Sequence, residues 1–184
     1  MTAISSQHIH PVQLLFDLSQ QAKESARGLP QRIDIKDVWS GIGFIIEDIR
    51  LIAPIDDVNE ILHCPNLTMV PGTQPWVKGI ANVRGTLMPI MDLKGFLNMP
   101  MKSVTNQSRV LVVRDGDNAV GLLVDEVLGL RHFKDEDKVG SVSRFEEALR
   151  PYVRGAFRRQ SEEMMVVSLK TIARVVSREP QLRE

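Results

Sequence analysis

The chain has 184 residues, 43% of them apolar, so it can bury a core, and its length suits one domain or two small, closely packed ones. Its 23 Lys and Arg residues balance 23 Asp and Glu residues, so it lacks the basic excess of a typical nucleic-acid binder. The single cysteine, Cys64, excludes an internal disulfide. A signal peptide and an apolar run of about 20 residues are both missing, which predicts a cytoplasmic protein without membrane insertion.

Residues 1–40 are expected to form a polar tail followed by one helix. Apolar residues recur there at spacings of three and four, which places them on one helical face: Leu15, Leu18, Ala22 and Ala26. Pro11 suits the first turn of this helix, and Gly28 followed by Pro30 ends it. The apolar face favours packing on the body of the protein over binding to a partner.

Short β strands are expected beyond Trp39. Residues 41–55 indicate a strand, a tight turn at Glu47-Asp48 and a second strand. Further strands are predicted at Thr68–Val70, Val77–Val83, Leu87–Met91, Val110–Val113, Val120–Val127 and Met164–Leu169, with glycine-containing turns between several of them.

Three short helices are predicted among the strands. They are Asp92–Asn98, Glu147–Arg150 after a capping box at Ser143–Glu146, and Leu169–Ser177. Many short strands with so few helices indicate a mainly β fold built as small barrels or a sandwich.

An internal repeat divides this β region into two halves. Pro75–Gly79 recurs as Pro151–Gly155, an offset of 76 (151 − 75), and Ile90–Lys94 recurs at the same offset as Val166–Lys170. An acidic pair also recurs, at Asp56-Asp57 and at Asp125-Glu126. The repeat predicts two similar barrels of about 60 to 75 residues each. A barrel this small would be only marginally stable alone, so we expect the two to share a core. One irregular β domain with coincidental similarities is the alternative.

Candidate catalytic and metal-binding residues are few. His63 adjoins Cys64, but neighbouring side chains on a strand point to opposite faces, and no spacing supplies the four ligands of a zinc site. Cys64 has no evident base beside it, so a structural thiol is expected. The acidic pairs Asp56-Asp57 and Asp125-Glu126 could look catalytic, but their recurrence favours a structural role. The enzymatic alternative is a small-ligand hydrolase that uses Asp56, Asp57 or Cys64. With no phosphate-binding glycine loop either, we expect no enzymatic activity, metal or cofactor.

The most distinctive stretch runs from Val70 to Leu93. It contains Pro75-Trp76-Val77-Lys78-Gly79, then Asn82-Val83-Arg84-Gly85, a hydrophobic strand that includes Pro89, and Asp92-Leu93. This pattern is similar to the signature of the CheW family, the adaptors that join chemoreceptors to a histidine kinase. Supporting matches extend the resemblance over residues 41–177: Val58–Ile61, Gly121–Asp125 and Tyr152–Gly155.

The resemblance implies two five-stranded, SH3-like β-barrels around a shared hydrophobic core. The CheW-like domain would occupy residues 41–177 as two interleaved barrel subdomains, with a C-terminal tail at residues 178–184. The family binds the regulatory domain of the kinase through its barrel ends. It also holds the cytoplasmic tip of a methyl-accepting chemoreceptor in a groove between the barrels.

Motif positions assign the partner contacts to five residues: Glu60, Gly79, Asn82, Val83 and Arg84. The same residues also have structural interpretations. Gly79 suits a backbone with positive φ, Asn82 suits a hydrogen bond to a turn, and Arg84 suits an ion pair with Glu60. Because Arg is enriched at interface hot spots, we favour direct contact for Arg84.

Within the family, the resemblance is greatest to the adaptors of chemosensory systems that control type IV pilus twitching motility. It is carried by the N-terminal helix, Trp39–Phe44, Trp76–Gly79 and Ile90–Leu93. One departure is Ala81-Asn82-Val83, where many relatives have a larger apolar residue and then Asn-Leu. This departure could tune the choice of partner. The alternatives are an adaptor of flagellar chemotaxis and a nucleic-acid-binding β-barrel protein.

Overall fold

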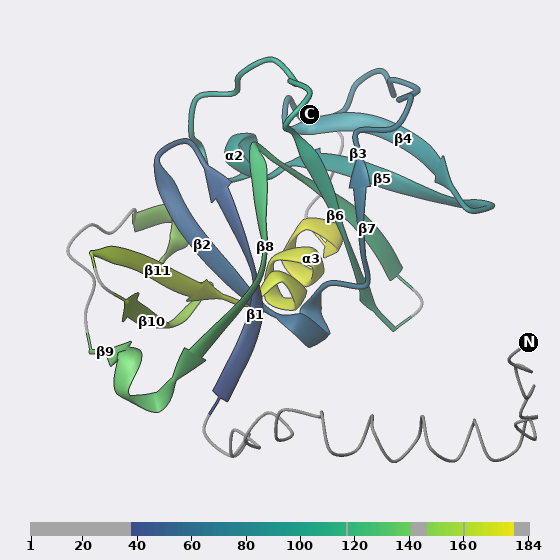
Figure 1. The fold of residues 1–184 in the computed structure, drawn as a ribbon. Coiled ribbons are helices and arrows are strands. Elements are labelled where there is room, and N and C mark those ends of the chain that lie inside the picture. Colours follow the sequence, from purple (N-terminus) through teal and green to yellow (C-terminus); the bar gives the residue numbers. More distant parts are fainter. Residues whose placement is uncertain (1–37, 117, 141–146, 160, 179–184) are drawn as a thin grey trace, which may run out of the picture. The chain divides into compact units, whose positions relative to one another are not determined.

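The computed structural model describes residues 38–116, 118–140, 147–159 and 161–178 (Figure 1). The expected N-terminal tail and helix, the capping box at residues 143–146 and nearly all of the C-terminal tail lie outside the described residues. Among the described residues, strands greatly outnumber helical segments, which confirms the mainly β prediction.

The described elements follow one another along the chain as hairpins alternating with short helical turns. In order they are β1 (Val38–Ile46), β2 (Ile49–Pro54), the 3-10 turn η2 (Ile55–Asp57), β3 (Glu60–His63), β4 (Val77–Val83), β5 (Thr86–Asp92), α2 (Leu93–Phe96), β6 (Arg109–Asp115), β7 (Asn118–Val124), β8 (Glu126–Lys134), η3 (Asp135–Asp137), β9 (Lys138–Val139), η4 (Glu147–Leu149), β10 (Val153–Arg159), β11 (Glu162–Val167) and α3 (Leu169–Arg178).

These strands form two sheets. The first sheet has six strands in the order β8-β1-β2-β11-β10-β9, and the second has five in the order β3-β6-β7-β5-β4. Neighbouring strands are antiparallel except for β2 with β11 and β5 with β7, which are parallel. The described residues therefore form two sheets, and the closure of these sheets into SH3-like barrels stays a prediction.

The sequence repeat is visible as repeated backbone geometry. The β4–β5 pairing has a bulge between Val77 and Gly79, and the β10–β11 pairing has one between Val153 and Gly155, which are the same repeat positions. Each hairpin is also followed closely by a helix, α2 or α3. The repeat therefore reflects two copies of one supersecondary unit.

A pair of equivalent hydrogen bonds supports the same conclusion. The backbone N–H of Asp92 donates to the carbonyl of Trp76 at 2.7 Å, and that of Ser168 donates to the carbonyl of Tyr152 at 3.0 Å. The repeat offset of 76 separates the two donors (168 − 92) and the two acceptors (152 − 76). The offset found in the sequence thus holds in the backbone hydrogen bonding.

The two halves exchange their first hairpins. β1 and β2 come from the first half but pair with β8 and β11 of the second half, whereas β6 and β7 of the second half pair with β3 and β5 of the first. Each sheet consequently contains strands from both halves, and neither half supplies a complete sheet by itself.

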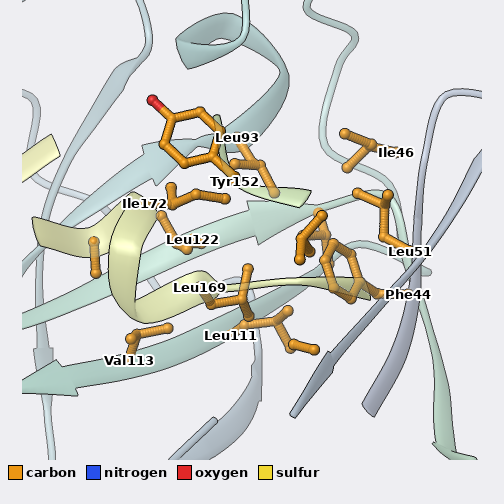
Figure 2. Packing of buried hydrophobic residues seen from close by; sticks show 14 of the residues in the cluster. Phe44, Ile46, Leu51, Leu93, Leu111, Val113, Leu122, Tyr152, Leu169 and Ile172 are labelled. Carbon is orange, nitrogen blue, oxygen red and sulfur yellow. The ribbon is translucent and has the colours of Figure 1, made fainter. Parts of the chain in front are cut away.

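Buried apolar side chains form three clusters. The largest includes Phe44 from β1, Leu111 from β6 and Ile172 from α3, so it joins the two sheets and the terminal helix (Figure 2). The second cluster belongs to the second sheet, and the third belongs to the first sheet, where the rings of Phe133 and Phe157 stack with centroids 4.6 Å apart. The expected shared core is therefore present, together with a smaller core in each sheet.

Both described α-helices begin at a side-chain cap. The Asp92 carboxylate accepts hydrogen bonds from the backbone N–H groups of Lys94 and Gly95, and the Ser168 hydroxyl accepts one from Thr171. One face of α3 is buried, at spacings typical of a helix: Leu169, Ile172, Ala173 and Val176. The predicted helices at residues 92–98 and 169–177 are confirmed, and the helical part of the 147–150 segment is a 3-10 turn.

Two strand predictions need correction. The predicted strand Thr68–Val70 is wrong, because only Thr68 pairs, through a single bridge to Ile80. Pro71 follows this segment and has no N–H to extend a ladder. The predicted strand Val120–Val127 is divided between two strands, β7 and β8. Pairing of β7 with β6 ends at Val124, and the backbone N–H of Asp125 donates to the carbonyl of Ile45 in β1.

Candidate functional site

The β4–β5 hairpin carries four of the five predicted contact residues and projects from the rest of the second sheet (Figure 1). Val83 pairs with Thr86, which leaves Arg84 and Gly85 as a two-residue turn with φ values of +51° and +84°. Two successive positive φ values are typical of the type I′ turn that fits the twist of a β-hairpin. The sequence Asn-Val-Arg-Gly therefore builds a tight hairpin with an arginine at its tip.

The side chain of Asn82 stabilises this turn. Its Oδ1 atom accepts a hydrogen bond of 2.8 Å from the backbone N–H of Gly85, which confirms the structural interpretation made from sequence. The same side chain is exposed. Asn82 thus shapes the turn and remains accessible at the surface.

Arg84 links the hairpin tip to β3. Its Nη2 atom lies 2.7 Å from Oε1 of Glu60, so the expected ion pair is present. The Arg84 side chain is 80% exposed and that of Glu60 is 24% exposed, and ion pairs at such exposure contribute about 0–1 kcal/mol to stability. The guanidinium keeps most of its surface free for another carboxylate.

Val83 and Gly79 occupy interior positions. Val83 is 8% exposed and packs in the core of the second sheet. Gly79 has a φ of +137°, and a Cβ atom there would lie 2.4 Å from the carbonyl oxygen of Thr68, so only glycine fits. The structure thus places these two residues beneath the surface, where they support the hairpin.

Exposed apolar side chains beside the hairpin were missed by the sequence reasoning. Leu87 is 69% exposed and lies directly across from Asn82, so the two side chains share one face of the hairpin. Met69 is 83% exposed and follows Thr68, which bridges to β4. The apolar pattern of β5 does not reveal Leu87, because most of its apolar neighbours are buried. We name Glu60, Asn82, Arg84 and Leu87 the hairpin surface.

The recurrent acidic residues hold the two repeat halves together. The Asp57 carboxylate accepts hydrogen bonds from the Ser168 hydroxyl at 3.3 Å and from the Lys170 N–H at 3.2 Å. Asp125 accepts one of 2.5 Å from Nζ of Lys94, whose side chain is 4% exposed. Lys94 and Lys170 are equivalent in the repeat. The structural role predicted for the acidic pairs is therefore what the geometry shows.

The remaining candidates for chemistry are Cys64 and the side chains that could bind a metal. Burial raises the pKa of the Cys64 thiol, against a smaller opposing effect of Lys78, and a raised pKa leaves less of the reactive thiolate. Within the described part of the chain, His, Cys, Asp and Glu side chains do not gather into any group of three or more that could hold a metal ion. No helix among the described residues is long and apolar enough to span a bilayer.

A sequence model of the CheW-like domain matches residues 40–176, a range that includes both sheets except the first two residues of β1, and all but the last two residues of α3. The chain belongs to the CheW-like family. Members of this family are scaffold and adaptor proteins of chemosensory signalling rather than enzymes.

Two curated relatives illustrate the similarity. The CheW-like chain is 45% identical to protein PilI of Pseudomonas aeruginosa over 150 residues, which are 82% of this chain and 84% of PilI. It is 32% identical to the chemotaxis protein CheW of Helicobacter pylori over 123 residues, which are 67% of this chain and 74% of that protein. The expected resemblance to the pilus branch of the family is thereby confirmed as similarity to PilI.

The fold is shared with a solved structure. The crystal structure of the scaffolding protein TtCheW from Thermoanaerobacter tengcongensis superimposes with a TM-score of 0.65 and 22% identity, covering 79% of this chain and 99% of that one. At this identity the match supports the CheW fold for the two-sheet arrangement described above.

Proposed function

We propose that this CheW-like chain is a cytoplasmic adaptor that couples a methyl-accepting chemoreceptor to a CheA-like histidine kinase, in a chemosensory pathway that controls type IV pilus twitching motility. The observation that carries the proposal is the 45% identity to PilI over most of both chains. The lower identity of 32% to a chemotaxis CheW protein favours the pilus pathway over flagellar chemotaxis.

The hairpin surface is the proposed contact site for one of these partners. It combines an exposed guanidinium, an exposed amide and an exposed apolar side chain on one tight hairpin, which is the mixture found at interface hot spots. Gly79 and Val83 act indirectly in this proposal, because they fix the position of the hairpin. Zero net charge and the scaffold role of the family favour proteins over nucleic acid as partners.

Each contact of the adaptor is expected to be modest. An interface of about 800 Å² or less per partner with a Kd near 1 μM corresponds to about −8 kcal/mol. The receptor, adaptor and kinase would then be held together by many such contacts in one assembly.

The test measures binding of the full chain to the regulatory domain of the kinase and, separately, to the receptor tip, both from the same cell. Arg84→Glu should weaken one of the two complexes by about 2 kcal/mol or more, because it removes a hot-spot charge and introduces repulsion. The folded protein should lose about 1 kcal/mol or less, because the pair with Glu60 is exposed.

A charge exchange separates direct contact from support. If Arg84 served only to pair with Glu60, the double variant Glu60→Arg with Arg84→Glu would restore the affinity that the single variant loses. We expect it not to do so. The matched control is Arg150→Glu, which breaks an exposed ion pair with Glu147 of η4 and should leave both affinities unchanged. Wild-type protein that binds neither partner would refute the proposed function.

A further inference from the structure

A second candidate binding site lies on the first sheet, on different strands from the hairpin surface. A cavity of about 360 Å³ opens between β8 and the β10–β11 hairpin. Its floor is apolar, formed by Phe133 and Met164, which are 5% and 4% exposed. Its rim is cationic, with the exposed side chains of Arg131 and Arg159.

The positive charge of this rim is not cancelled locally. Among the described residues that line the cavity, the one carboxylate is that of Glu162, which is already paired with Arg50 at 3.4 Å. Arg159 donates a hydrogen bond of 3.4 Å to the backbone carbonyl of His132, which orients the guanidinium without neutralising it. Arg131 forms no ion pair with any other described residue. Two guanidinium charges therefore border a cavity in a chain whose net charge is zero.

The backbone beneath the rim is shaped to receive Arg131. Gly43 of β1 lies under this side chain, and a Cβ atom there would be 3.2 Å from Cγ of Arg131 and 3.1 Å from Cε of Met164. The missing side chain leaves room for the alkyl stem of Arg131, which covers apolar surface while the guanidinium stays in water. Gly43 thereby lets the rim charge and the apolar floor lie close together.

We propose that this cavity binds an acidic segment of a partner protein, with a carboxylate held by Arg131 and Arg159 and a neighbouring apolar side chain placed over the floor. Arg guanidinium groups recognise carboxylates through two parallel hydrogen bonds. Leu130 at the cavity edge is 48% exposed, which extends the apolar contact along the bound segment. Charge complementarity and the adjacent apolar surface together favour an acidic peptide over a free inorganic anion.

This site goes beyond the proposed function, because it adds a contact on the opposite sheet from the hairpin surface. A scaffold with one site on each sheet can hold two partners at once. The prediction is independent of whether the hairpin surface contacts receptor or kinase, so each proposal can fail without the other.

The experiment titrates the full chain with an array of short synthetic peptides that carry a central Asp or Glu next to an apolar residue, and follows backbone amide resonances by NMR. The matched peptides replace the acid by Asn or Gln. We expect the best acidic peptides to shift the resonances of Leu130 to Phe133 and of Arg159, and to bind about tenfold or more tightly than their amide counterparts. Raising the salt from about 0.05 to 0.5 M should weaken this binding.

Substitutions then assign the site. Arg131→Glu and Arg159→Glu should each abolish the shifts, while Arg114→Glu, the same charge change at an exposed position of β6 in the second sheet, should leave them intact. Three outcomes would overturn the proposal: no acidic peptide binds, the shifts map elsewhere, or inorganic phosphate produces the same shifts as strongly as the peptides. The amide spectrum of each variant would reveal a loss of folding. In that case Arg131→Lys and Arg159→Lys, which keep the charge but lose the planar guanidinium, would be used instead, and each should weaken peptide binding partially.

Discussion

The most decisive test of the repeat concerns two glycines that are equivalent in sequence but not in environment. Gly79 in β4 corresponds to Gly155 in β10 at the offset of 76 (155 − 79). Gly79 has a φ of +137° and its backbone lies against Thr68, whereas a Cβ atom at Gly155 would meet nothing within 4 Å, and its φ is not in the positive range. Replacing each by alanine therefore adds the same methyl group to a crowded position and to an open one.

The expected cost at Gly79 follows from the contacts that the methyl group would break. Thr68 and Ile80 exchange two backbone hydrogen bonds of 2.9 Å, and a Cβ atom 2.4 Å from the Thr68 oxygen would force this bridge apart. Two hydrogen bonds contribute about 1 kcal/mol each, and the positive φ adds about 1–3 kcal/mol of backbone strain. Gly79→Ala should thus lower the free energy of unfolding by about 3–5 kcal/mol.

Urea unfolding of the full chain, followed by tryptophan fluorescence and by circular dichroism, measures this difference. Gly155→Ala should change stability by about 1 kcal/mol or less, with a small gain if it restricts the unfolded chain. A third variant, Gly85→Ala, measures the cost of the positive φ alone. Gly85 has a φ of +84° and a Cβ atom there would meet nothing within 4 Å, so the loss of stability should be about 1–2 kcal/mol. If Gly79→Ala and Gly155→Ala were equally destabilising, the argument from the Thr68 bridge would be wrong.

Three further predictions concern polar groups that are wholly or partly buried. Lys94→Met should lower the free energy of unfolding by about 1–3 kcal/mol in urea unfolding. This loss is smaller than that expected for a fully buried ion pair, because the Asp125 side chain is 31% exposed. Adding Asp125→Asn should recover part of the loss, because it removes the unpaired carboxylate. Burial raises the pKa of the Asp92 carboxyl, so its contribution to stability is fully present below the ordinary aspartate pKa and is lost as pH rises through the raised value. Asp92→Asn keeps the helix cap, so in urea unfolding its stability relative to the wild type should rise as the pH is raised above the ordinary aspartate pKa. Asp92→Ala should lose the cap and about 1 kcal/mol. Because burial raises the pKa of Cys64, native protein should react with iodoacetamide at neutral pH more slowly than the urea-unfolded chain, and equal rates would contradict the assignment of a structural thiol.

The sequence predicts those parts of the fold that depend on local patterns. Strand β4 begins and ends where the pattern of residues 77–83 places it, and α3 follows the spacing of its buried residues. The repeat also predicts a shared core, because two marginal units gain stability by burying their faces together. These features could be predicted because hydrophobic periodicity and turn-forming residues are properties of residues close together in the sequence.

The pairing partners of the strands could not be read from the same patterns. β3 was missed because Glu60-Ile61-Leu62-His63 is short and half polar, and it becomes a strand through pairing with β6, which is distant in the sequence. The second half of β8 contains charged residues and is a strand because β1 lies beside it. The exchange of hairpins between the halves is a tertiary choice that no local signal specifies.

The candidate site shows the same division. Motif positions assigned Glu60, Asn82 and Arg84 to partner contact. In the structure Arg84 pairs with Glu60, and Asn82 bonds the turn that carries Arg84. Sequence reasoning could not separate exposed members from buried ones, so Val83 and Gly79 were grouped with them, and Leu87 was missed. Exposure depends on which face of a strand meets the core, and that depends on the sheet as a whole.

The exchange of hairpins also has a consequence for how the chain folds. β1 must find β8 in the second half of the chain, and β2 must find β11, which lies close to the last helix, so neither sheet can close until most of the polypeptide is available. Such distant pairings give a high contact order, and chains of this kind fold on a timescale of milliseconds to seconds. During synthesis the first hairpin emerges long before its partners and must wait with unpaired edges, which makes it the segment at which delayed folding would lead to association with other chains.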